Sequence, residues 1–256
     1  MGWEPRIARA ALHAWEEPCI SGSRGSGTVF FTGCPLRCVY CQNTEISQQD
    51  FAGEPASPCR LREIFEHLIE QGAHNINLVN PTHFALAVWE CLREWKPPVP
   101  VIYNSSGYEK LETLRRLEGY IDVYLPDFKY WESSAAKAYS QAPGYAETAR
   151  EAIQEMARQT GKVQLDPAGM VQKGTIVRHL VLPGHTRQAM QILQWIADTL
   201  SDTVWVSLMA QYLPWGRVLE GEAPELNRKI TRREWQKVQD FLFSLGLDGF
   251  VQERSA

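Results

Sequence analysis

The sequence of 256 residues lacks a long hydrophobic run and a strong excess of charge of either sign. No apolar stretch approaches the roughly 20 residues that a membrane-spanning helix needs, and residues 1–6 lack the basic-then-apolar pattern of a secretory signal peptide. The formal net charge is −4, so no global field attracts nucleic acid or an anionic membrane. The composition therefore predicts a cytoplasmic protein without a membrane partner and disfavours a nucleic-acid partner. It also predicts that the basic stretch 228–233 is a solvated helix start.

Cysteine is also scarce, with six residues in the chain, which argues against a disulfide scaffold and for a reducing compartment. Three of the six, Cys34, Cys38 and Cys41, are spaced C-x3-C-x2-C directly after an apolar run. Thiolates are the usual ligands of iron–sulfur clusters, and a cluster of four irons normally takes four of them. Three thiolates leave one iron with an open coordination position, which makes a metal site reactive. The spacing therefore predicts that these cysteines are both metal ligands and catalytic.

A structural zinc site or three buried thiols would use the same residues. Structural zinc is almost always bound by four ligands, so zinc would need a distant fourth ligand such as Cys19, Cys59 or a histidine. The number of ligands therefore favours a cluster over zinc. Of the other cysteines, Cys91 is expected to pack inside a helix and Cys59 to be incidental near a helix start, while the role of Cys19 stays open.

Apolar strand-like runs alternate with helix-period segments along the chain, which is the pattern of a parallel sheet covered by helices. The predicted strands are 28–32, 75–79, 99–103, 121–125, 175–182 and 203–208, and helices are predicted over 61–69, 111–117, 192–200 and after Thr231. Six β/α units are too few for a closed eight-stranded barrel. We therefore expect an α/β fold of the partial (β/α)6 barrel type, with residues 1–25 as an N-terminal extension and 26–256 as the barrel domain. The turn residues within 162–174 predict a hairpin excursion.

Polar residues follow the predicted strands at the points where the strands end. The carboxyl ends of the strands of a β/α barrel converge on the face that holds the active site. We therefore expect these side chains to surround the mouth into which the cysteine loop also opens. Asparagine, aspartate and serine also make turns, so the convergence of the set carries more weight than any single member. The set is Asn80, Thr82, Asn104, Ser105, Ser106, Asp127 and Gln211.

The cysteine loop resembles the signature of the radical S-adenosylmethionine (SAM) enzymes, C-x3-C-x-aromatic-C, with Tyr40 at the aromatic position. The resemblance covers nearly the whole chain and is closest to the pyruvate formate-lyase activating enzyme-like group, through the runs 15–22, 79–84, 103–108, 124–130 and 178–184. It implies a partial barrel of the radical SAM type with a [4Fe–4S] cluster on the three cysteines. The implied reaction is the reductive cleavage of SAM to a 5′-deoxyadenosyl radical, which abstracts hydrogen from a substrate. A glycyl radical enzyme and a flavodoxin- or ferredoxin-type reductant are the implied partners.

The resemblance also implies roles at individual positions. Tyr40 would lie beside the adenine, and Asn80 and Thr82 would stand in for the usual Gly-Gly-Glu that pairs with the SAM amino group. The other implied SAM contacts are Asn104 and Ser106 near SAM, Asp127 and Lys129 as an Asp-x-Lys element, Arg178 on the ribose side, and Gln211 at the last strand. His179 is expected to face the core.

One departure from the activating enzymes concerns the substrate. Those enzymes carry an Asp-Gly-Pro-Gly-Ile-Arg stretch ahead of the cluster, whereas residues 22–28 here read Gly-Ser-Arg-Gly-Ser-Gly-Thr. The substrate therefore does not follow from the resemblance. A radical SAM enzyme that modifies a small molecule, a peptide or RNA is an alternative, and a non-catalytic metal-binding protein is a third.

Overall fold

The computed structural model describes residues 4–48 and 51–252. The strands are β1 (Arg6–His13), β2 (Ser26–Phe31), β3 (Glu54–Pro55), β4 (Ile76–Val79), β5 (Val101–Ser105), β6 (Val123–Pro126), β7 (Gln164–Leu165), β8 (Val171–Leu180), β9 (Val204–Met209) and β10 (Gly249–Gln252). The α-helices are α1 (Pro18–Ser21), α2 (Thr44–Gln48), α3 (Pro58–Glu70), α4 (Ala85–Glu94), α5 (Leu111–Arg116), α6 (Ser133–Ser140), α7 (Tyr145–Thr160), α8 (Thr186–Leu200) and α9 (Arg232–Ser244). Three short 3-10 helices are η1 (Thr82–Phe84), η2 (Gly216–Val218) and η3 (Pro224–Leu226).

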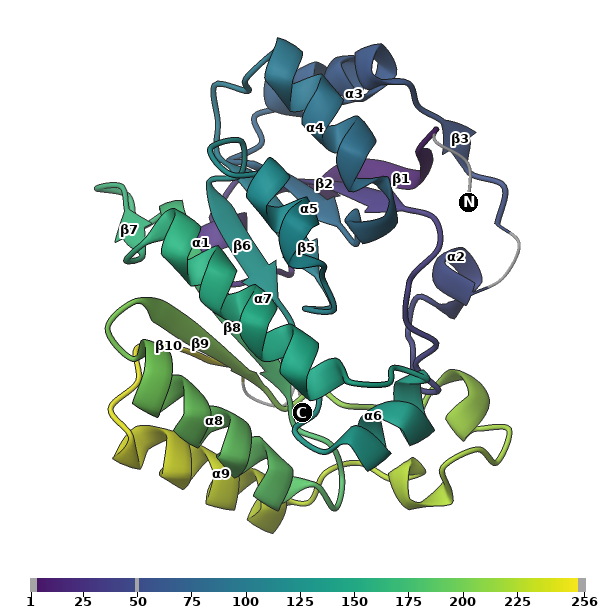
Figure 1. Ribbon diagram of the computed structural model, residues 1–256, viewed down its shortest axis with the longest axis vertical. Helices are drawn as coiled ribbons and strands as arrows, with labels where there is room; N and C mark the ends of the chain where they lie inside the picture. Colours follow the sequence, from purple (N-terminus) through teal and green to yellow (C-terminus); the bar gives the residue numbers. More distant parts are fainter. Residues whose placement is uncertain (1–3, 49–50, 253–256) are drawn as a thin grey trace.

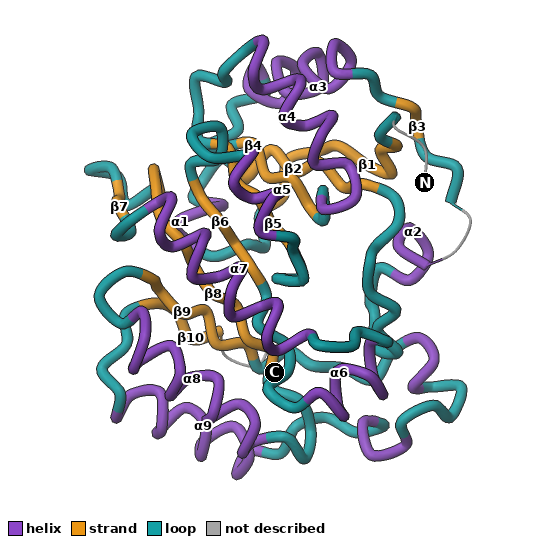
Figure 2. The backbone as a smooth tube through the Cα atoms, in the orientation of Figure 1, coloured by secondary structure: helices purple, strands orange, loops and turns teal. Residues whose placement is uncertain are grey.

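The strands form one curved sheet in the order β10-β9-β8-β6-β5-β4-β2-β1-β3, and β7 pairs with β8 outside this path. The seven strands from β10 to β2 in that order are all parallel. Antiparallel β1 and β3 extend the sheet beyond β2. Helices α3, α4, α5, α7, α8 and α9 cover its outer face (Figures 1 and 2). The expected open partial barrel is therefore confirmed.

The predicted strands correspond to β2, β4, β5, β6, β8 and β9, with shifted ends. The strand predicted at 99–103 is β5, which begins at Val101 because Pro100 has no N–H for the ladder. The hairpin expected within 162–174 is present as the antiparallel pair β7–β8. The short strand β10 was not predicted, since four residues carry too little periodicity to identify a strand. The division at residue 25 stays a prediction, and β1 pairs with β2 across it.

Side chains alternate between the two faces of each strand, and this alternation divides the core. Outward residues such as Leu78 and Tyr103 pack with the buried faces of α3 and α4. Inward residues such as Val123 and Ile176 pack instead on Cys19 and Ile20 of α1. The Ile20 carbonyl accepts a hydrogen bond from the side-chain amide of Asn75 (2.8 Å), directly before β4. Helix α1 therefore fills the barrel at the amino ends of the strands, and the opposite end is left for a site.

Several local predictions are confirmed. Thr231 begins α9 with the expected capping box, and Arg228 pairs with Glu234 (2.7 Å), so the basic stretch is a helix start. Cys91 is buried in α4, and Cys59 is exposed at the start of α3. Within residues 4–48 and 51–252, no helix has both the length and the apolar character needed to cross a membrane.

Candidate functional site

The three cysteines lie in the loop between β2 and α2, and all three are partly buried. Backbone hydrogen bonds fasten this loop to the end of α6, because Arg37 N–H donates to the Ser140 carbonyl (3.0 Å) and Val39 N–H donates to the Tyr139 carbonyl (2.8 Å). The loop is therefore held by a helix that lies about a hundred residues later in the chain.

Two cavities open beside this loop, with volumes of 170 and 280 Å³. Both are lined by Cys38, Cys41, Asp127, Lys129 and Arg178. The smaller cavity is also lined by Cys34, Asn80, Asn104, Ser105 and Ser106, and the larger one by Tyr40 and Gln211. The structure therefore brings together, at the carboxyl ends of the strands, every site residue predicted from the sequence except Thr82.

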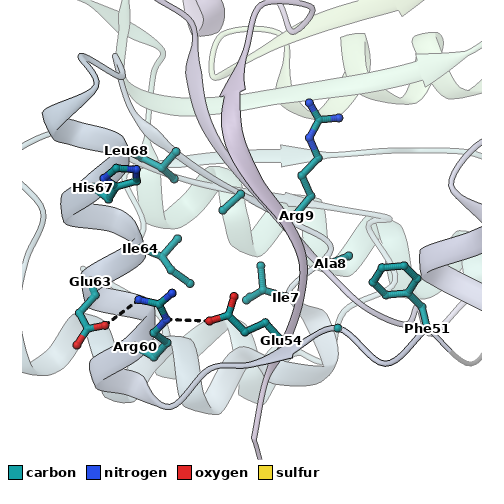
Figure 3. A pocket seen from close by; sticks show the side chains of 12 residues that line it. Ile7, Ala8, Arg9, Phe51, Glu54, Arg60, Glu63, Ile64, His67 and Leu68 are labelled. Atoms are coloured by element: carbon teal, nitrogen blue, oxygen red, sulfur yellow. Dashed lines mark hydrogen bonds and ion pairs between the residues drawn. The ribbon is translucent and has the colours of Figure 1, made fainter.

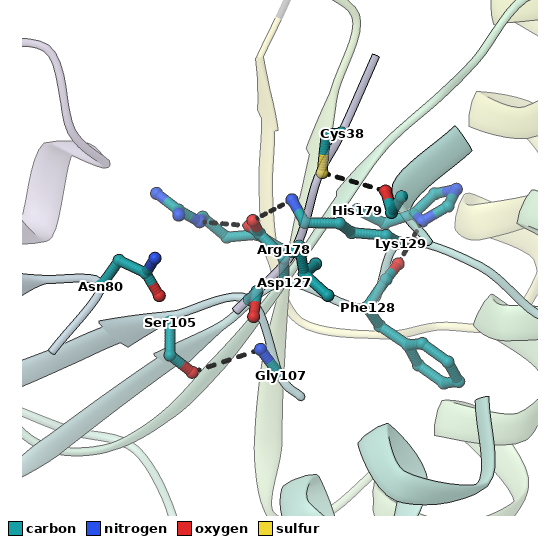
Figure 4. A network of polar contacts seen from close by, with 12 residues as sticks. Cys38, Asn80, Ser105, Gly107, Asp127, Phe128, Lys129, Arg178 and His179 are labelled. Atoms are coloured by element: carbon teal, nitrogen blue, oxygen red, sulfur yellow. Dashed lines mark hydrogen bonds and ion pairs between the residues drawn. The ribbon is translucent and has the colours of Figure 1, made fainter. Parts of the chain in front are cut away.

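Asp127 lies at the centre of a buried ion network (Figure 4). Its Oδ2 accepts from Lys129 Nζ (2.5 Å), and its Oδ1 accepts from Arg178 Nε (3.0 Å). Arg178 Nη2 also donates to Asn104 Oδ1 (2.7 Å), which joins β5 to β8. Burial alone would raise the pKa of Asp127, but Lys129 and Arg178 together hold this pKa below its usual value. Since the Lys129 and Asp127 side chains are only 19% and 17% exposed, their pair is not a surface bridge.

Glu16 is a site residue that the sequence analysis missed. Its Oε2 lies 3.4 Å from Arg178 Nη1, and its side chain is 10% exposed. Burial raises the pKa of Glu16, although the Arg178 charge opposes this. In the sequence Glu16 lies within the run 15–22 that carries part of the family resemblance, but nothing in that run reveals that the segment enters the barrel.

Asn80 follows β4 with a φ of 54°, a left-handed conformation that asparagine tolerates better than most residues. Its backbone N–H donates to the Asn104 carbonyl (2.8 Å). Burial raises the pKa of the Cys34 thiol to about 12, while hydrogen bonds from Leu36 and from the Asn80 side chain act in the opposite direction. Asn80 therefore lies against Cys34.

Thr82 is turned away from the cysteines. Its hydroxyl donates to Glu109 Oε1 (2.5 Å), and it lines a separate cavity of 300 Å³ together with Lys110. Glu109 was not identified from the sequence, because a glutamate in a loop normally faces solvent. Here it is 2% exposed, and burial raises its pKa to about 7.

Ser106 has a buried hydroxyl with no hydrogen-bond partner within the described residues, and it lines the smaller cavity. Its carbonyl accepts from the Tyr145 hydroxyl (2.7 Å), which also lies 2.9 Å from the Asp127 carbonyl oxygen. Gly107 follows with a φ of 74°, and a Cβ at this position would collide with that Asp127 oxygen. The strand ends of β5 and β6 can approach this closely only because residue 107 is glycine.

Tyr40, Gln211 and His179 have different surroundings. Tyr40 is 8% exposed, and its hydroxyl lies 2.5 Å from that of Tyr130. Gln211 is exposed and donates to Gln252 Oε1 (2.5 Å). His179 is buried, as expected, with Nδ1 2.6 Å from the Phe128 carbonyl. Burial lowers the pKa of His179 to about 4, so the imidazole is a neutral core group.

The side chains at the cavity wall can be compared with the ligands that a metal ion or an iron–sulfur cluster needs. Within residues 4–48 and 51–252, no three His, Cys, Asp or Glu side chains converge as ligands of a single metal ion. In a [4Fe–4S] cluster each thiolate binds a different iron, so the three sulfurs need not meet at one point. The three thiols, the unpartnered hydroxyl of Ser106 and the two buried cations therefore fit a cluster with a polar, anionic co-ligand.

A larger cavity of 710 Å³ lies between β1 and α3 (Figure 3). Its main charged group, Arg60, is paired with Glu54 Oε1 (3.0 Å) and Glu63 Oε2 (2.9 Å). No cysteine lines this cavity. Because no cysteine lines this cavity and its Arg60 is already paired with two glutamates, the two cavities that the three cysteines line are the better candidate site.

No protein-family model matches the sequence. The uncharacterized protein MJ0674 of Methanocaldococcus jannaschii is 29% identical over 246 residues, which cover 93% of this chain and 67% of that protein.

The fold is found in solved structures of other proteins. Streptococcus suis SuiB bound to S-adenosylmethionine superposes with a TM-score of 0.58 at 10% identity, over 88% of this chain and 49% of SuiB. A radical SAM methyltransferase from Sphaerobacter thermophilus gives a TM-score of 0.56 at 10% identity, over 97% of this chain and 76% of the methyltransferase. The chain therefore spans about half the length of SuiB, and its fold is the partial barrel of the radical SAM enzymes.

Proposed function

We propose that the chain is a radical SAM enzyme in which Cys34, Cys38 and Cys41 hold a [4Fe–4S] cluster. The two cavities beside these cysteines would receive SAM. The observation that carries the proposal is convergence: the thiols and eight of the nine other predicted residues line the same two cavities, from strands far apart in the sequence. A site without a ligand would give no reason to gather two buried cations and an unpartnered hydroxyl beside three thiols.

The residues of the site have distinct tasks in this proposal. When bound, the cluster and SAM supply a reductive cleavage of SAM to methionine and a 5′-deoxyadenosyl radical, which abstracts a hydrogen atom. Lys129 and Arg178 offer positive charge to the SAM carboxylate, and Asp127 holds both side chains in position. Ser106 offers a hydroxyl that is free to bind SAM. Apolar side chains in the same cavity wall, including Phe30 and Leu36, exclude water.

A finer proposal concerns the substrate. By resemblance to the activating enzymes, the hydrogen would come from a glycine of a partner enzyme, with electrons from a flavodoxin- or ferredoxin-type reductant. Leu213 lines the 280 Å³ cavity beside the cysteines and is 43% exposed, and Trp215, two positions later in the chain, is 50% exposed. These exposed apolar side chains favour a macromolecular substrate. A peptide is the second candidate, because SuiB has been solved with the precursor peptide SuiA.

The experiment is anaerobic. The protein is reconstituted with iron and sulfide, reduced and mixed with SAM, and 5′-deoxyadenosine is measured by mass spectrometry. The wild type should form this product and Cys38→Ala should not. Cys59→Ala, which removes an exposed thiol at the start of α3, is the matched control and should behave as the wild type. The proposal is wrong if a fully loaded, reduced wild type forms no 5′-deoxyadenosine, or if Cys38→Ala retains both cluster and product.

A further inference from the structure

The sulfur of Cys38 has a close hydrogen-bond donor outside the cysteine loop. The Ser140 hydroxyl donates to Cys38 Sγ at 2.9 Å, across 102 positions of sequence. The contacts of the other two sulfurs differ: Leu36 N–H lies 3.4 Å from Cys34 Sγ, which also has the Asn80 side chain against it, and the Ser47 hydroxyl lies 3.3 Å from Cys41 Sγ. Ser140 is fully buried and is the last residue of α6. Cys38 is therefore the sulfur with the shortest contact to a hydroxyl.

Ser140 is in turn held by two tyrosines. The Tyr130 hydroxyl lies 2.6 Å from Ser140 Oγ, and the Tyr40 hydroxyl lies 2.5 Å from that of Tyr130. Tyr130 is fully buried and Tyr40 is 8% exposed. The three hydroxyls therefore form a continuous chain that ends at Cys38, which we call the hydroxyl relay (Tyr40, Tyr130 and Ser140).

The direction of the relay follows from counting protons. A metal-bound thiolate can only accept hydrogen bonds, and each hydroxyl carries one proton. Because Ser140 gives its proton to the sulfur, Tyr130 must donate to Ser140, and Tyr40 must donate to Tyr130. All three O–H dipoles then point toward Cys38. Such chains polarise one another in a low-dielectric interior, so the last donor is stronger than an isolated serine.

We propose that the hydroxyl relay raises the reduction potential of the cluster bound through Cys38, with Ser140 as a positioning residue. The proposal rests on the proposed function only in requiring a cluster on the three cysteines. Reduction adds one electron from an external one-electron reductant, breaks no bond and makes the thiolate sulfurs more negative. A hydrogen bond to sulfur therefore stabilises the reduced cluster more than the oxidised one.

The relay also assigns a task to Tyr40 beyond its place in the C-x3-C-x-aromatic-C signature. A phenylalanine at this position would fill the same space but could not donate to Tyr130. The ammonium group of Lys129 is a second influence on Cys38, since its charge also favours the thiolate. Variants of the relay leave Lys129 in place, so they separate the two effects.

The test is a redox titration of the reconstituted cluster, followed by electron paramagnetic resonance. Ser140→Ala removes the donor to Cys38 and should lower the reduced-to-oxidised ratio at a fixed potential about tenfold, which is ~59 mV for a one-electron couple. Tyr130→Phe keeps Ser140 and should shift the potential in the same direction by less. The matched controls are Ser26→Ala and Tyr124→Phe, which remove buried hydroxyls bonded to Asn75 and Gln159. Both controls should titrate as the wild type.

Each outcome bears on a different claim. The relay is refuted if Ser140→Ala and Tyr130→Phe hold full clusters at the wild-type potential, or if the controls shift equally. If Ser140→Ala does not retain a cluster, the reduction potential of Tyr130→Phe alone tests the relay. If the wild type holds a cluster but does not cleave SAM, the proposed function fails while the potentials still test the relay. A wild type that binds no cluster overturns both.

Discussion

Replacing Glu109 by glutamine should change the pH dependence of stability, because this carboxyl is buried among hydroxyls. Glu109 accepts from Thr82 (2.5 Å) and Tyr103 (3.3 Å) and is 2% exposed. Burial raises its pKa from 4.5 to about 7 in the folded protein. Between these two values the folded state keeps a proton that the unfolded state has lost. The stability that the protonated carboxyl contributes is therefore complete below pH 4.5 and is lost as the pH rises through 7.

The magnitude follows from the two pKa values. At about 1.4 kcal/mol for each pH unit, the difference between 4.5 and about 7 corresponds to about 3 kcal/mol. The glutamine side chain of Glu109→Gln cannot ionise, so the free energy of unfolding of this variant does not fall in this way as the pH rises. The free energy of unfolding of the variant, minus that of the wild type, should therefore increase by about 3 kcal/mol between pH 4 and pH 8.

The assay is urea unfolding of both proteins at pH values from 4 to 8, followed by the fluorescence of the nine tryptophans. Glu112→Gln, which changes an exposed carboxylate in the first turn of α5, is the matched control and should show a constant difference from the wild type. Comparison with the wild type at each pH cancels the titration of all other groups. A difference for Glu109→Gln that stays flat across this range would refute the reasoning.

Three further substitutions test other parts of the structure by urea unfolding at pH 7. Gly107→Ala should destabilise the protein by about 1–3 kcal/mol from its left-handed backbone alone, with the collision at the Asp127 oxygen adding to this; an unchanged midpoint would contradict the close approach. Asp127→Asn should cost about 3 kcal/mol, because Lys129 and Arg178 lose their buried counter-charge, and an effect within ±0.5 kcal/mol would show that solvent screens this network. Thr231→Ala should cost about 1 kcal/mol through the lost cap of α9; no change would mean that the helix start does not depend on the capping box.

The sequence by itself determined the features that depend on neighbours a few positions away. Alternating apolar runs and helical periods identified six parallel strands and the α/β class, since these periods arise from backbone geometry. The capping box at Thr231 and Glu234 and the spacing of the three cysteines are equally local. Most of the residues at the cavity wall were also predictable, because a parallel sheet brings the carboxyl ends of its strands to one edge.

Only the tertiary structure decided which side chains meet at that edge. Ser140 reaches Cys38 across 102 positions, and Glu16 reaches Arg178 across 162. No periodicity relates such pairs. Their contact depends on the curvature of the sheet, on the packing of α6 against the cysteine loop and on the entry of residues 16–21 into the barrel.

Thr82 illustrates the same limit on prediction. Its position after β4 was correctly associated with the strand ends, but its hydroxyl turns to the buried carboxyl of Glu109 and away from the cysteines. The direction of a side chain at a strand end is set by the partner that satisfies it once water is excluded. That partner is known only when the chain has folded.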